Sequence, residues 1–150
     1  MKRSKRLQTI VDIKAKQEQA ALEILGQSQR QHTEMQKQVE HLTAYRGDYV
    51  DKCNAFARDG VKVSRLVEFR GFIDKLDVAI AGQERQLKRI EQDVQLKRQV
   101  WEFTHRSTQS IQKVRESALK VERKIEDKRE QFEQDERASR FGRAKATDAN

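Results

Sequence analysis

The chain has no proline, one cysteine and few aromatic residues among its 150 positions. Because proline breaks helix interiors, its absence leaves every segment free to be helical. One cysteine excludes an internal disulfide and fits a reducing compartment. No apolar run approaches the roughly 20 residues of a membrane span, and the basic start MKRSKR precedes no apolar signal core. We therefore expect a cytoplasmic protein with no membrane span.

High charge and modest apolar content limit the kind of core that the chain can build. Charged residues make up 37% of the sequence and apolar residues 35%, so a globular core of ordinary thickness would be hard to fill. Disorder is excluded by the apolar periodicity described next, which predicts a long, thin helical molecule instead. The net charge of +8 favours acidic partners, whether nucleic acid, anionic lipid or an acidic protein surface.

Apolar residues recur along residues 5–57 in alternating steps of four and three. That spacing is typical of a supercoiled helix, because 3.5 residues per turn keep one row of side chains, the seam, facing a partner helix. The positions between are mostly Gln, Glu, Lys and Arg, which are good helix formers. The seam of this first helix consists of Leu7, Val11, Lys14, Glu18, Ala21, Leu25, Ser28, His32, Met35, Val39, Leu42, Arg46, Tyr49, Cys53 and Phe56.

A second helix is predicted over residues 65–141 by the same pattern. A step of three from Ile111 to Val114, where four is due, predicts a stammer that overwinds the coil locally. Gly142 is expected to end this helix and leave residues 142–150 as a tail. Its seam is Leu66, Phe69, Ile73, Leu76, Ile80, Gln83, Leu87, Ile90, Val94, Lys97, Trp101, Thr104, Thr108 and Ile111, then Val114, Ala118, Val121, Ile125, Lys128 and Phe132.

Residues 58–64 interrupt the helical pattern. Asp59 and Gly60 favour a turn, the β-branched run Val61–Val63 is poor for helix, and Ser64 could cap the next helix. Two seams joined by so short a break can face each other within one chain. The predicted fold is all-α: a single domain, residues 1–150, formed by an antiparallel coiled-coil hairpin of two long helices with unequal arms.

The predicted register places Tyr49 near Ile73 and Leu25 near Lys97. At about 1.5 Å per residue the first helix would be about 80 Å long and the second about 110 Å, so the end of the second would overhang. Val121, Ile125 and Phe132 would then have no partner in their own chain.

The sequence offers no set of residues suited to catalysis, to a metal or to a cofactor. It has no Gly-rich phosphate loop and no paired cysteines, and its histidines, His32, His41 and His105, are dispersed. His32, Cys53 and Trp101 fall on the seam, which favours structural roles over ligand, thiol or binding roles. A two-helix hairpin also encloses no cavity in which a pKa could be shifted, so we expect no enzymatic activity.

The placement of the charges argues against a nucleic-acid-binding protein. Lys2, Arg3, Lys5 and Arg6 form a basic arm, but the remaining charges alternate in sign, as on the solvated face of a long helix. The usual nucleic-acid folds and base-stacking aromatic residues are also missing.

Two ridges of side chains near the turn suggest a docking surface. Tyr45, Phe72 and Ala79 lie beside the seam, where two helices alone cannot bury them fully, and excess aromatic residues at one end of a hairpin are typical of an interface. A wider core at this end is an equal alternative. The ridges are Gln38, Leu42, Tyr45 and Tyr49 on the first helix, and Phe72, Leu76, Ala79 and Gln83 on the second.

The stretch YRGDYVDKCNAFARDGVKVSRLVEFRGFIDKLDVAIAGQERQL, followed by QVWEF, resembles the FliJ family of the bacterial flagellar type III export apparatus. The similarity extends over nearly the whole chain in layout and turn position, and is clearest from about Gln38 to Trp101. Its most specific points are two tyrosines four residues apart, a turn that contains glycine, an aromatic-rich start to the second helix, and Trp101 beyond Ile90.

The resemblance implies a non-catalytic stalk and general chaperone, similar to the γ subunit of rotary ATP synthases. Its implied partners are the export ATPase hexamer (FliI-like), the regulator of that ATPase (FliH-like), the export gate protein (FlhA-like) and substrate-specific export chaperones. The implied location is cytoplasmic, peripheral to the inner membrane at the export apparatus.

The resemblance also implies two binding surfaces. In the family the gate-binding patch lies near the turn, and Gln83 departs from the histidine expected at its position. The terminal ends would enter the ATPase ring. The implied gate-binding residues are Gln38, Leu42, Tyr45, Tyr49, Phe72, Leu76, Ala79 and Gln83, and those expected at the ring are Leu7, Val11, Val121, Ile125 and Phe132.

Two alternatives to a flagellar export stalk stay open from the sequence alone. One is the equivalent stalk of a virulence injectisome, which would share the same physics. The other is a basic coiled-coil protein that binds nucleic acid or acidic filaments.

Overall fold

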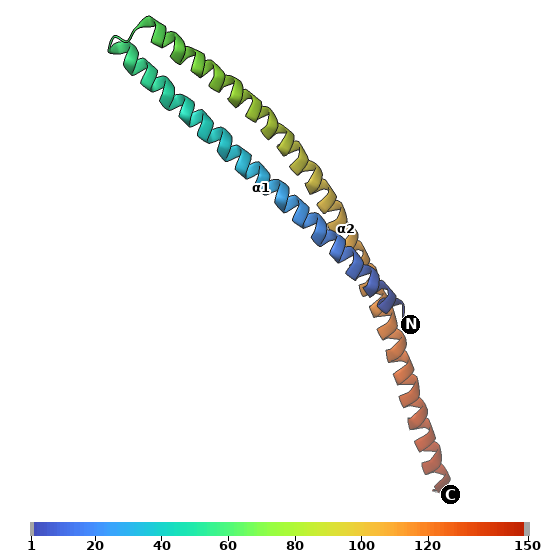
Figure 1. Cartoon of the computed structure of the whole chain (residues 1–150). Coiled ribbons are helices and arrows are strands. Elements are labelled where there is room, and N and C mark those ends of the chain that lie inside the picture. Colours follow the sequence, from blue (N-terminus) through green and yellow to red (C-terminus); the bar gives the residue numbers. More distant parts are fainter. Residues whose placement is uncertain (1, 149–150) are drawn as a thin grey trace. The chain divides into compact units, whose positions relative to one another are not determined.

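The computed structural model describes residues 2–148, which form two helices joined by a short turn. Helix α1 spans Arg3–Arg58 and helix α2 spans Val63–Asp148, and no strand occurs within this range. The helices contain 56 and 86 residues, so the all-α fold class with two long, unequal arms is confirmed. Figure 1 shows the chain reversing between α1 and α2 at the turn.

The reversal depends on Gly60, which has a φ of +85°. This left-handed conformation is readily adopted only by glycine and lets the chain leave the helix axis. The Val61 N–H donates to the Phe56 carbonyl at 3.3 Å, and the Asp59 N–H donates to the Ala55 carbonyl at 3.1 Å. The bond from Val61 to Phe56 is that of a Schellman cap, so the Phe56 carbonyl near the end of α1 is satisfied by the backbone of the turn.

The start of α2 corrects the predicted cap at Ser64. The Lys62 carbonyl accepts hydrogen bonds from the Arg65 N–H at 3.0 Å and the Leu66 N–H at 3.2 Å, so Lys62 holds the N-cap position. Ser64 therefore lies inside the first turn of α2. Because the turn at Gly60 is tight, α2 can begin as early as Val63. The low helix propensity of the β-branched residues Val61 and Val63 is too weak an effect to prevent this.

The end of α2 corrects a second prediction, since Gly142 does not stop the helix. Glycine ends a helix when it adopts a positive φ, and among residues 2–148 only Gly60 does so. Good helix formers surround Gly142, and Arg140 pairs with Glu136 at 3.3 Å one turn earlier. The helix therefore continues to Asp148, through most of the segment expected as a tail.

The packing of α1 against α2 divides into two compact units. Unit 1 combines the described parts of residues 1–18 and 104–150, and unit 2 is residues 19–103. Each helix passes through both units.

Unit 2 contains a narrow core made by the predicted seams. Ala21, Leu25 and Leu76 are buried, and all other seam positions of this unit except Phe56 are at least half-buried. The observed register agrees within one residue with the predicted pairing of Tyr49 and Ile73. Arg46 lies three residues before Tyr49, and it forms an ion pair with Asp77, which lies four residues after Ile73. Periodicity thus predicted which side chains face inward.

Unit 1 is held by smaller and more polar seam residues. Val11, Ala118, Ser4 and Thr108 are buried. Beyond Ile111 the facing positions continue with Arg115, Ala118 and Glu122, while Val114 and Val121 are exposed. The predicted stammer is therefore wrong: the regular step of four after Ile111 is kept, because the long stem of Arg115 can cover apolar surface at a position that apolar residues were expected to fill.

Candidate functional site

Five aromatic rings form a continuous cluster beside the turn, within unit 2. Tyr49 is at its centre, with ring centroids 4.6 Å from Phe72 and 5.9 Å from Phe69. Tyr45 meets Phe72 edge-on at 6.4 Å, and Phe56 stacks on Phe69 at 5.6 Å. We call these residues the aromatic cluster. Because edge-to-face and offset contacts between rings are favourable, the cluster links the two helices next to the turn.

The outer rings of the aromatic cluster remain accessible. Tyr45 is 50% exposed and Phe72 is 37% exposed, whereas Leu76, one turn along α2, is 8% exposed. Burial raises the pKa of the Tyr49 hydroxyl, and the charges of Cys53, Tyr45 and Glu68 act in the same direction. The cluster therefore has an inner part that packs the helices together and an outer part that presents aromatic surface to solvent.

The predicted gate-binding residues lie together on this part of unit 2, but they differ in accessibility. Leu76 belongs to the core, so it can support the surface without contributing much area to it. Leu42, Tyr49 and Gln83 are half-buried. The exposed members are Gln38, Tyr45, Phe72 and Ala79.

A shallow pocket of about 350 Å³ adjoins Tyr45 and includes a residue that the sequence reasoning missed. Gln38, Leu42, Tyr45 and Gln83 line it together with His41. His41 follows Gln38 by three positions and precedes Tyr45 by four, so helical spacing could have placed it on the same face. The Gln83 Oε1 is buried, with no hydrogen-bond partner among the described residues.

The residues expected at an ATPase ring lie in unit 1 and fall into two groups. Val11 is buried against α2 and Leu7 is half-buried, so neither offers a free apolar surface while the helices are paired. Val121, Ile125 and Phe132 are 57%, 62% and 67% exposed. Only the α2 members of this predicted site are therefore accessible.

Pairing of α1 with α2 in unit 1 extends to Glu122. Its carboxylate accepts hydrogen bonds from the Ser4 N–H at 3.1 Å and the Ser4 hydroxyl at 2.7 Å. Ser4 is in the first turn of α1. Beyond this point Lys2, just before α1, lines a shallow hollow with Ile125 and Glu126, and Arg123 to Asp148 are all exposed. We call this stretch of α2 the overhang.

Two of the histidines make hydrogen bonds between the helices. His105 Nδ1 is 2.6 Å from Glu18 in unit 1, and His32 Nε2 is 3.2 Å from Glu91 in unit 2. Within residues 2–148, no three His, Cys, Asp or Glu side chains gather as a metal site would require. Cys53 is half-buried with a free thiol.

A comparison with known families identifies the chain. The model described as "Flagellar FliJ protein" matches residues 3–147. The chain belongs to the FliJ family. A FliJ protein from Escherichia coli strain K12 is 25% identical over 127 residues, which covers 82% of this chain and 86% of the relative.

A second FliJ protein, from Salmonella typhi, is also 25% identical, over 134 residues that cover 89% of this chain and 91% of the relative. No solved structure matches the chain significantly. Neither helix of this FliJ family member, over its described residues, is apolar enough along its length to cross a membrane.

Proposed function

We propose that this chain is a non-catalytic stalk and general chaperone of the flagellar type III protein export apparatus, acting in the cytoplasm at the inner membrane. Its partners in this proposal are a FlhA-like export gate protein, a FliI-like ATPase hexamer with its FliH-like regulator, and export chaperones that it helps to recycle. Membership of the FliJ family supports a flagellar role. The observation that carries the finer assignment is the half-exposed aromatic pair Tyr45 and Phe72.

Aromatic residues that stay accessible on an ordered surface are typical binding hot spots. Tyr45 and Phe72 come from different helices and contact each other edge-on, so their rings are fixed before a partner arrives. Binding then costs little side-chain entropy, because rigid aromatic side chains already hold their bound arrangement. We assign the gate-binding surface to these two rings together with exposed Gln38 and Ala79 and the adjoining pocket.

The overhang supports the assignment of an ATPase ring as the second partner. Ile125 and Phe132 continue the seam spacing of α2 at positions where no residue of α1 faces them. Apolar residues at seam spacing gain stability when another helix or groove covers them. A ring that surrounds this part of α2 would supply such a cover.

The gate-binding assignment can be tested by titrating purified chain with the cytoplasmic domain of its export gate protein. The Tyr45→Ala/Phe72→Ala variant should weaken binding at least about tenfold, as loss of two aromatic hot spots would. Leu96→Ala/Phe103→Ala is the matched control, because both of those side chains are exposed in unit 2 outside the aromatic cluster. Equal affinities for the two variants would refute the assignment.

The ring assignment has its own test, the activity of the cognate export ATPase with and without the chain. Wild-type chain should raise the ATPase activity, and Ile125→Ser/Phe132→Ser should reduce that effect while binding to the gate domain is unchanged. An ATPase that does not respond to the wild-type chain would rule out the stalk role.

A further inference from the structure

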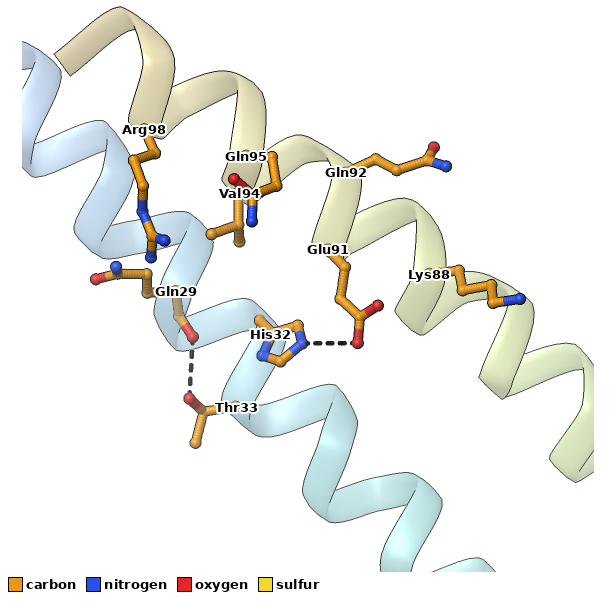
Figure 2. A pocket seen from close by; sticks show the side chains of 9 residues that line it. All are labelled: Gln29, His32, Thr33, Lys88, Glu91, Gln92, Val94, Gln95 and Arg98. Atoms are coloured by element: carbon orange, nitrogen blue, oxygen red, sulfur yellow. Dashed lines mark hydrogen bonds and ion pairs between the residues drawn. The ribbon is translucent and has the colours of Figure 1, made fainter. Parts of the chain in front are cut away.

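Unit 2 contains a large groove whose lining residues are separate from the aromatic cluster. It lies between α1 and α2, has a volume of about 930 Å³ and is open to solvent. Figure 2 shows the side chains that line it, and that of Lys88 extends along the groove edge away from α1. The lining residues are Gln29, His32 and Thr33 from α1, and Lys88, Glu91, Gln92, Val94, Gln95 and Arg98 from α2. A groove of this size between two helices can accommodate side chains of another segment.

Eight of the nine lining residues carry a side chain that can form hydrogen bonds. Gln29 on α1 and Gln95 on α2 contribute amides to the lining, and Val94 is the only lining residue with an aliphatic side chain alone. Thr33 is already engaged, because its hydroxyl donates to the Gln29 carbonyl at 3.0 Å. Such a lining can form several hydrogen bonds with a partner that carries polar side chains.

The charges of the lining favour an acidic occupant. Lys88 and Arg98 have no carboxylate within ion-pair distance among residues 2–148, whereas the one acidic lining residue, Glu91, is bonded to His32 at 3.2 Å. Lys88 and Arg98 are ten residues apart on α2, which corresponds to about 15 Å along the helix axis. Two carboxylates of one partner separated by that distance could reach both cations.

We propose that this groove binds an acidic helical segment of a partner protein, with carboxylates about three helical turns apart paired to Lys88 and Arg98. Small or amide side chains between the carboxylates would bond to Gln29 and Gln95. A protein segment fits better than nucleic acid, because two separated cations beside Glu91 would neutralise few phosphates. This binding site is additional to the proposed function. Binding in the groove does not depend on binding at the aromatic cluster.

The test uses a fluorescent helical peptide of about 20 residues with two glutamates ten positions apart. Fluorescence anisotropy measures its affinity for the full chain, with a glutamine-for-glutamate peptide and duplex DNA as comparison ligands. The groove variant is Lys88→Glu/Arg98→Glu. Lys75→Glu/Arg89→Glu is the matched control, because it makes the same charge change at exposed positions of α2 outside the groove.

We expect the groove variant to bind the acidic peptide about tenfold more weakly and the control variant to stay within about twofold of wild type, since charge reversal at a contact replaces attraction with repulsion. Lys88→Gln/Arg98→Gln should give an intermediate loss, and circular dichroism confirms that each variant is folded. Equal losses in both charge-reversal variants, no binding of the acidic peptide, or tighter binding of DNA than of the peptide would each overturn the proposal.

Discussion

Glu122 on α2 holds the first turn of α1 by accepting two hydrogen bonds from Ser4, at 3.1 Å from the N–H and 2.7 Å from the hydroxyl. The N–H groups of a first helical turn have no partner within the helix, and an anion there also interacts favourably with the helix dipole. Here the cap comes from the other helix. α1 has no acidic residue in its first turn, so Glu122 supplies the negative charge that its own sequence lacks.

This cap predicts a pH dependence confined to the start of α1. Hydrogen bonds from the Ser4 hydroxyl and N–H lower the pKa of Glu122, burial opposes them, and the charge of Lys2 acts with them. Since the folded pKa is depressed, the stabilisation is present above the usual range of a glutamate and is lost as pH falls through the folded pKa. Amide exchange in the first turns of α1, corrected for intrinsic rates, should therefore show less protection at about pH 3 than at about pH 6.

Glu122→Gln should weaken the protection at the start of α1 and remove its dependence on pH. Glu126→Gln is a suitable control, because it removes an exposed carboxylate one turn later on the same helix. A pH profile that is the same in wild type and Glu122→Gln would show that another group is responsible.

The overhang should open more readily than the paired part of α2. Its residues are exposed and face no part of α1, so local unfolding there breaks helical hydrogen bonds without separating the two helices. Hydrogen exchange measured by mass spectrometry should be at least about tenfold faster in peptides beyond Ile125 than in peptides around Ala118. Uniform protection through Phe132 would contradict this expectation unless a second copy pairs there, which sedimentation would detect.

Substitutions of core residues near the turn should lower stability more than substitutions of surface residues there. Leu76→Ala removes a buried side chain and should cost about 2–5 kcal/mol of unfolding free energy. Tyr45→Ala with Phe72→Ala removes half-exposed rings and should leave helicity nearly unchanged, with a smaller shift in Tm than Leu76→Ala. If thermal unfolding showed the double variant to be the less stable of the two, its rings would be core rather than docking surface.

Two substitutions in the turn should change the stability of the chain in opposite directions. Gly60→Ala should destabilise the chain by about 1 kcal/mol or more, because alanine is strained at a φ of +85°. Lys62→Asp should stabilise it by about 0.5–1 kcal/mol, since aspartate at the N-cap can accept a hydrogen bond from the first turn of α2. Urea unfolding gives both values, and a loss of stability in Lys62→Asp would argue against Lys62 as the N-cap.

Apolar periodicity was enough to predict the two helices and, within unit 2, the seam and the register, because burial between two paired helices follows helical spacing almost directly. In unit 1 it failed beyond Ile111, where Arg115 and Glu122 take the facing positions in place of Val114 and Val121. Leu25 and Leu76 lie in the core as expected. The ends of the elements were less predictable. Ser64 is a good cap and Gly142 a good stop by residue type, but neither takes that role, since the bonding of neighbouring backbone decides where a helix begins and ends.

The sequence predicted the aromatic surface better than it predicted how that surface is built. Tyr45 and Phe72 were placed beside the seam by spacing, and their exposure agrees. The stacking of Phe56 on Phe69 and the position of His41 in the adjoining pocket depend on side-chain conformations, which spacing does not specify. The cap from Glu122 to Ser4 was missed because it joins positions 118 residues apart.

The most direct test of the proposed role is a residue-resolved spectrum of the chain as its export gate domain is added. Fluorotyrosine and fluorophenylalanine labels can be assigned by single substitutions and followed by ¹⁹F NMR. The resonances of Tyr45 and Phe72 should shift or broaden at stoichiometric gate domain, while those of Phe103 and Phe132 stay unchanged. Shifts at Phe103 or Phe132 without any change at Tyr45 and Phe72 would contradict a gate-binding surface at the aromatic cluster.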